Sequence, residues 1–259
     1  LEFSVTNPII YNITRVFYAE NNMSSRADFR IDMAYPVDHY PYMFSKLVSV
    51  SPRPNSVETD IRGNVHAYWD VGLNPGETFS VNANFHVMLF ETDWFDYINI
   101  SSVEQYLNVG SHVLFTSSGN SINSTNEEII STANNIIGEE ENYYLMAHEL
   151  YTWETNNIDY DYSLQGKDGV ETLMAGEGTC HGYASLYASL ARSTGLPTKY
   201  VSGKVFSNEG LTEGHAWNEV FIQGIGWLPV DTTWGSTVND WFAHYDTSHL
   251  PLTSLSEWP

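Results

Sequence analysis

Residues 176–192 read GEGTCHGYASLYASLAR, and this stretch carries the strongest structural signal in the chain. Two glycines before the cysteine predict a tight loop, and residues 184–192 have the spacing of a helix with one face of small residues. Gly195-Leu196-Pro197 ends that helix, because glycine and proline both terminate helices. Cys180 is therefore expected at the N-terminus of a closely packed helix.

Cys180 is the one cysteine in 259 residues, so no intramolecular disulfide can form. At a helix N-terminus, free backbone N–H groups and the helix dipole favour a thiolate, which is the nucleophilic form of cysteine. The same N–H groups, chiefly that of Cys180 itself, can hold a developing oxyanion. The position alone leaves open the alternative that Cys180 is a small packing residue in the core.

A second stretch supplies a candidate base. Residues 214–222, GHAWNEVFI, are expected to form a strand that opens with His215, and residues 227–231, WLPVD, the return strand. If the loop between them has an odd number of residues, His215 and Asp231 share one face at the same end of the hairpin. An Asp that accepts from the imidazole fixes its tautomer and supports its protonated form. Alone, His215 is also typical of a strand end and Asp231 of a turn cap.

Together these motifs resemble the transglutaminase-like core of the papain-type cysteine enzymes. The matching segments, in the order and spacing of the family, are Gly178 to Cys180, Gly195 to Pro197, His215 to Glu219 and Trp227 to Trp234. The resemblance covers roughly residues 104–245. It points to the microbial, extracellular type, in which such a core follows a β-sandwich domain.

The resemblance implies an α+β fold, with an N-terminal antiparallel β-sandwich followed by a papain-like core of helices and an antiparallel sheet. It implies Cys180 as nucleophile, His215 as general base and Asp231 as orienting acid. The family attacks amides through a thioester acyl-enzyme that passes the acyl group to water or to an amine. We expect a cysteine-dependent amide hydrolase or acyltransferase acting on a peptide or protein. Crosslinking by a protein-glutamine transglutaminase and a catalytically silent extracellular scaffold are the alternatives.

Other motif residues are expected around the triad. Trp217 and Trp234 are expected to wall the cleft, and Glu219 to lie behind the histidine as a further partner. The family's second oxyanion donor has no recognisable motif here, and neither do the calcium-binding segments of the animal enzymes. Asp159 and Asp161 lie in a polar stretch without the Gly and Glu positions of an EF-hand loop. No metal or other cofactor is expected.

The N-terminal part is predicted to consist of strands. Apolar residues recur at every second position over residues 79–89, and turn signals separate such runs, which is typical of a β-sandwich. Helical spacing appears over residues 129–137 and over about 140–156. We therefore expect a β-sandwich domain over residues 1–100 and a catalytic domain over residues 101–259.

Ten Lys and Arg oppose 32 Asp and Glu, a formal net charge of −22. A chain this acidic repels phosphate backbones, and nucleic acid is therefore not an expected partner. No apolar run is long enough to span a membrane.

Four N-x-Ser/Thr triplets, at Asn12, Asn22, Asn99 and Asn123, fit an extracellular or cell-surface protein. No signal peptide is recognisable, and a start at Leu1 is expected of a processed protein or a fragment. The oligomeric state stays open.

Overall fold

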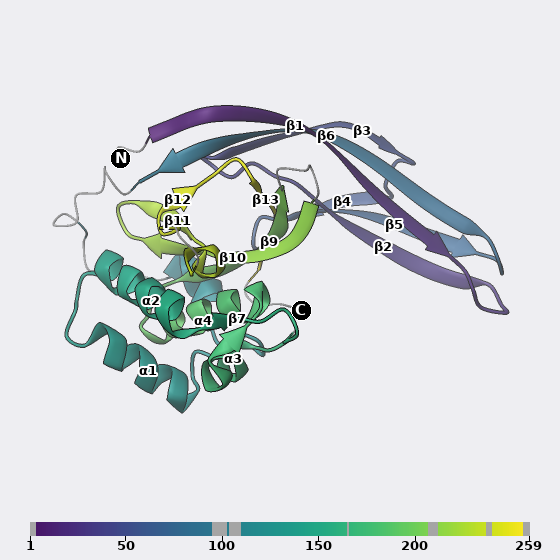
Figure 1. Ribbon diagram of the computed structural model, residues 1–259. Helices are drawn as coiled ribbons and strands as arrows, with labels where there is room; N and C mark the ends of the chain where they lie inside the picture. Colours follow the sequence, from purple (N-terminus) through teal and green to yellow (C-terminus); the bar gives the residue numbers. More distant parts are fainter. Residues whose placement is uncertain are drawn as a thin grey trace.

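The computed structural model describes residues 4–94, 103, 110–164, 166–206, 212–236 and 240–255. Long N-terminal strands extend away from a second part, in which helices lie against another sheet (Figure 1). Most strands pair antiparallel, and the described residues form five α-helices. The fold is therefore α+β, as the sequence predicts.

The N-terminal part is an antiparallel β-sandwich. One sheet has β6 (Thr78–Asp93) between β1 (Ser4–Glu20) and β3 (Met43–Ser51), and the other has β5 (Val65–Leu73) between β2 (Ala27–Tyr35) and β4 (Ser56–Thr59). Every second residue of β6 from Val81 to Leu89 is buried, which confirms the predicted alternation. The ring of Phe85 meets Tyr35 of the other sheet with centroids 5.1 Å apart, so the two sheets share one core.

The helices are α1 (Glu127–Ile137), α2 (Tyr143–Asn157), α3 (Gly169–Ala175), α4 (Cys180–Ser193) and α5 (Thr232–Gly235), preceded by the 3-10 helix η3 (Gly110–Phe115). The predicted helix over residues 129–137 is present as α1. The next helix begins at Tyr143 rather than near residue 140, because the Asn142 side chain accepts from the N–H groups of Tyr144 and Leu145 and caps it there. Within the described ranges, no helix combines the length and apolarity needed to cross a bilayer.

The second sheet has the order β11–β10–β9–β13 and is antiparallel throughout. Its strands are β9 (Thr198–Phe206), β10 (Thr212–Ile222), β11 (Gly226–Val230) and β13 (His249–Leu255). Helix α4 packs against β9 and β10, and all its residues from Gly182 to Arg192 are buried. The small side chains of Ala184 and Ala188 allow this close contact, as the sequence predicts.

The sandwich and the second part are in direct contact. Strand β12 (His244–Tyr245) pairs with the end of β6 and so extends a sheet of the sandwich. One hydrophobic cluster contains both Phe85 of β6 and Leu186 of α4. The expected boundary near residue 100 lies outside the described residues.

A buried charge cluster crosses this contact at Glu219 of β10, which is 1% exposed. Lys199 Nζ lies 2.7 Å from Glu219 Oε2, and the hydroxyl of Tyr42, from the loop before β3, donates to Oε1. His39 Nδ1 lies 3.6 Å from Oε1. Burial opposes ionisation of Glu219, but the charges of Lys199 and His39 outweigh it and hold the pKa of Glu219 below its ordinary value. The cluster therefore ties β10 to the sandwich.

We expect Glu219→Ala to lower the free energy of unfolding by about 3–5 kcal/mol, because half-buried Lys199 and buried Tyr42 would lose their partner. Denaturant unfolding near neutral pH measures the change. Since folding lowers the Glu219 pKa, the stability it contributes is complete above the ordinary glutamate pKa of about 4.3 and is lost as the pH falls through the lower, folded-state value.

Glu58→Ala is the matched control. Glu58 pairs with Arg30 at 3.7 Å, but its side chain is 58% exposed. Its loss is expected to change stability by less than about 1 kcal/mol. Equal losses in the two variants would contradict the bridging role of Glu219.

Candidate active site

A short parallel strand pair positions the loop before Cys180. Strand β7 (Asp159–Tyr160) pairs with β8 (Glu177–Gly178), and Cys180 begins α4 almost directly afterwards. An added Cβ at Gly178 or Gly182 would come within 2.9 or 2.4 Å of the Thr172 side chain. The glycines around the cysteine therefore allow α3, which carries Thr172, to lie against the first turn of α4.

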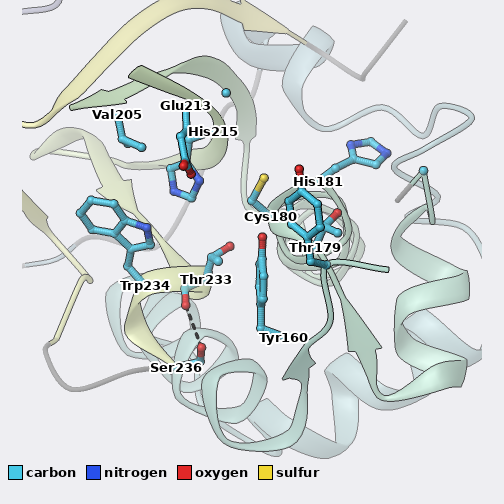
Figure 2. A pocket seen from close by; sticks show the side chains of 13 residues that line it. Tyr160, Thr179, Cys180, His181, Val205, Glu213, His215, Thr233, Trp234 and Ser236 are labelled. Carbon is cyan, nitrogen blue, oxygen red and sulfur yellow. Dashed lines mark hydrogen bonds between the residues drawn. The ribbon is translucent and has the colours of Figure 1, made fainter. Parts of the chain in front are cut away.

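Cys180 is half-buried, and its sulfur faces the ring of His215 across a cleft (Figure 2). It is the first residue of the helix, as the sequence predicts. Its backbone N–H consequently has no acceptor within the helix and lies at the end where negative charge is stabilised.

His215 lies on β10, is 8% exposed, and contacts two tryptophan rings. Its centroid lies 5.8 Å from that of Trp217 and 5.5 Å from that of Trp234. Nε2 lies 2.6 Å from Asp231 Oδ2, so Nδ1 is the ring nitrogen left to interact with Cys180. Burial opposes protonation of His215, but the charges and hydrogen bonds of Asp231 and Cys180 outweigh it and raise its pKa to about 10.

Asp231 follows β11 and caps α5. The β10–β11 register places odd residues opposite odd ones, which is the parity that puts His215 and Asp231 on one face. Oδ1 accepts from the N–H of Trp234 at 2.9 Å, while Oδ2 faces both His215 and His249. Burial opposes ionisation of Asp231, but the charge of His215 and the hydrogen bonds of both histidines lower its pKa well below the ordinary value.

His249, at the start of β13, was missed by the sequence analysis. Its Nε2 lies 3.1 Å from Asp231 Oδ2, and its Nδ1 lies 2.7 Å from Asp246 Oδ1. It belongs to an aromatic C-terminal segment outside the family's pattern, so no motif marks it. The spacing of Asp246 and His249, a carboxylate and an imidazole at i and i+3, is the signal that could have drawn attention to it.

His215, Asp231 and His249 offer three ligand atoms within 4.8 Å of one another, a spacing that a metal ion can use. The separations of 2.6 and 3.1 Å from Asp231 Oδ2 are hydrogen-bond distances. An ion bound by all three residues would have to displace the protons that now join them.

The cleft in front of Cys180 has a volume of about 1170 Å³. Its lining is aromatic and polar and includes Tyr160, Tyr162, His181, Glu213, Thr233, Trp234 and Ser236. Tyr160 points its hydroxyl toward Cys180, and Trp234 lies beside His215 (Figure 2). No motif marked Tyr160, because it reaches the cleft through the two-residue pairing of β7 with β8.

The three residues expected around the triad lie in different surroundings. Trp234 lines the cleft. Trp217 is 2% exposed and lies behind His215, over Gly203, where a Cβ would come within 2.5 Å of the indole. The structure does not bring Glu219 to this site, since its carboxylate binds Lys199 and Tyr42 instead.

Residues 130–232 match the family model of the transglutaminase-like superfamily. No curated protein sequence is significantly similar to the chain. The structure of a proposed cysteine protease from Cytophaga hutchinsonii is similar over 99% of this chain and 84% of its own, with a TM-score of 0.67 at 17% identity. The periplasmic domain of TgpA from Pseudomonas aeruginosa covers 83% of this chain and 72% of its own, with a TM-score of 0.46 at 14% identity. The first likeness confirms the predicted fold across both the sandwich and the core.

The reactivity of Cys180 tests its contact with His215. We expect iodoacetamide to label Cys180 rapidly even below about pH 7, because His215 stays protonated to about pH 10 and supports the thiolate. His215→Ala is expected to slow labelling at least about tenfold there, and to restore the behaviour of a free thiol, which ionises near pH 8.5 or so. Intact-mass spectrometry over time gives both rates.

His244→Ala is the matched control. His244 lies on β12, where its Nδ1 is 4.0 Å from Asp93, and it does not line the cleft. Its labelling profile should follow the wild type. Fast labelling of His215→Ala under mildly acidic conditions would show that Cys180 does not depend on the imidazole.

Proposed function

We propose that the protein is a cysteine-dependent amide-bond hydrolase that acts on peptide or protein substrates, with Cys180 as nucleophile, His215 as general base and Asp231 as orienting carboxylate. The observation that supports this most is the connection from Cys180 through His215 to Asp231. Its inner end is a buried hydrogen bond of 2.6 Å, and its outer end opens into the cleft. The superfamily match of residues 130–232 supports the same chemistry.

In the acylation step, the Cys180 thiolate attacks the carbonyl carbon of the amide, and the C=O electron pair moves to oxygen. The backbone N–H of Cys180, at the start of α4, donates to this oxyanion. When the intermediate collapses, the C–N bond breaks and His215 gives its proton to the leaving amine. The result is a free amine, a thioester on Cys180 and a neutral His215.

In the deacylation step, His215 takes a proton from a water molecule whose oxygen attacks the thioester carbonyl. The C–S bond breaks, a carboxylic acid leaves, and the Cys180 thiolate and protonated His215 return. Asp231 stays ionised and holds Nε2, so that Nδ1 keeps facing the sulfur. An amine in place of water would give transamidation, the reaction of a crosslinking enzyme.

We also propose an extracellular or cell-surface location. Asn12 and Asn22 of the N-x-Ser/Thr triplets are exposed, Asn123 is half-buried, and Asn99 lies outside the described residues. The net charge of −22 favours solubility and disfavours binding to nucleic acid. Fractionation of the native cells tests this, since recovery in the cytosol alone would contradict it.

The proposed reaction predicts a trapped thioester. Wild-type protein mixed with a peptide pool and quenched in acid is expected to carry an acyl adduct on Cys180 that hydroxylamine removes. Cys180→Ala is expected to form no adduct and no cleaved peptide, because the nucleophile is missing. Asp231→Asn is expected to lower turnover by up to about 10⁴-fold, because the imidazole loses its orienting partner. Mass spectrometry of protein and peptides reads out all three.

An amine acceptor added to the same mixture separates the two acyl fates. Hydrolysis predicts cleaved peptide with little amine incorporation, and crosslinking predicts the reverse. If iodoacetamide labels Cys180 rapidly but the peptide pool yields no acyl adduct and no product, the chain would act as a binding module. Capture of a partner by Cys180→Ala would then be the measurable activity.

A further inference from the structure

His249 has a carboxylate oxygen at each of its ring nitrogens. Nε2 lies 3.1 Å from Asp231 Oδ2, and Nδ1 lies 2.7 Å from Asp246 Oδ1. A neutral imidazole donates from one nitrogen and accepts at the other, whereas an ionised carboxylate only accepts. Both nitrogens must therefore carry a proton if both contacts are hydrogen bonds, which makes His249 an imidazolium.

The surroundings fix this ring in place. His249 is 2% exposed and contacts the rings of Trp217, Trp234 and Trp241 at centroid distances of 5.1, 4.4 and 5.3 Å. Tyr245 donates its hydroxyl to the backbone oxygen of His249 at 2.7 Å. These contacts come from β10, α5 and the segment before β13, so the ring is held from several sides.

Asp246 is itself anchored. Its Oδ1 accepts from the Ser248 N–H at 2.9 Å, and its Oδ2 accepts from the Ser248 hydroxyl at 2.7 Å. The titratable groups that face His249 are Asp231, Asp246, Tyr245 and His215, whose ring centroid is 5.5 Å away. Burial disfavours protonation of His249, but the hydrogen bonds and charges of Asp231 and Asp246 outweigh it and raise its pKa.

We propose that His249 is a positioning residue of this site, which holds the Asp231 carboxylate against His215 and completes a chain of alternating charges from Asp246 to Cys180. The proposal rests on the function proposed above. Along the chain, Asp246 is negative, His249 positive, Asp231 negative and His215 positive, and the thiolate ends it. His249 does not itself line the cleft, so it acts through Asp231.

The arrangement gives His249 two effects on Asp231. Its N–H donates to the same Oδ2 that accepts from His215, so the carboxylate is fixed by a second charged donor as well as by the Trp234 N–H. Its charge also compensates that of Asp231 in a buried setting, where an unpaired carboxylate would be costly. With the ring removed, Asp231 could turn, and His215 would lose its fixed direction toward Cys180.

Nitrogen NMR of the wild-type histidines tests the charge directly. We expect both ring nitrogens of His249 to be protonated at neutral pH, because the two carboxylates raise its pKa above the ordinary histidine value of about 6.5. His244, which is half-buried on β12 and has a single carboxylate neighbour among the described residues, Asp93 at 4.0 Å, supplies the comparison signal. A His249 that carries one proton at neutral pH would overturn the proposal, and this measurement needs no variant and no substrate.

The positioning role is tested by the rate of Cys180 labelling with iodoacetamide near neutral pH. His249→Ala is expected to slow labelling about tenfold or more, because a misdirected imidazole supports the thiolate poorly. His249→Gln, whose amide can still donate to Asp231, is expected to recover most of the rate. Asp246→Asn, at a partly exposed position, keeps the ring and is expected to give a smaller loss.

A packing role alone would give a different pattern. His249→Ala and His249→Gln would then lower the melting temperature together and leave the labelling rate of the folded protein unchanged, which would overturn the proposal. If His249→Ala does not fold, the Gln and Asn variants and the wild-type NMR still decide. Because none of these readouts needs turnover, failure of the positioning role and failure of the proposed reaction can be told apart.

Discussion

The hydrogen bond between His215 Nε2 and Asp231 Oδ2 is the interaction on which the rest of the site depends. It lies just beyond the last backbone pair of the β10–β11 hairpin, Asn218 with Val230, so side chains hold the two strands together there. Trp217 and Trp234 cover it and exclude water, which strengthens the attraction between the two charged groups. The ring orientation that results leaves Nδ1 as the ring nitrogen available to Cys180.

The features that could be predicted from the sequence are those that depend on short-range order. Alternation along β6, the start of α4 at Cys180 and the shared parity of His215 and Asp231 each follow from a local pattern, and the structure agrees with each. The glycines flanking the cysteine also have a local signature. Their partner, Thr172 of α3, shows why they are needed.

The features that escaped prediction depend on contacts between distant segments. Glu219 shares a face of β10 with His215, but Lys199 on the neighbouring strand and Tyr42 beside the sandwich bind its carboxylate first. His249 reaches Asp231 because β13 pairs with β9 after the chain has returned through β12 to the sandwich. Neither partner choice is visible in a window of sequence, since each is decided by how the sheets meet.

The pairing of β13 with β9 limits how far the chain can be shortened at its C-terminal end. The family match ends at residue 232, so a fragment with that endpoint would keep the cysteine, the histidine and the aspartate. It would also bare the β9 edge that β13 covers, a row of unsatisfied backbone groups of the kind that promotes edge-to-edge aggregation. The shortest piece able to fold around this chemistry is therefore longer than the piece that similarity marks.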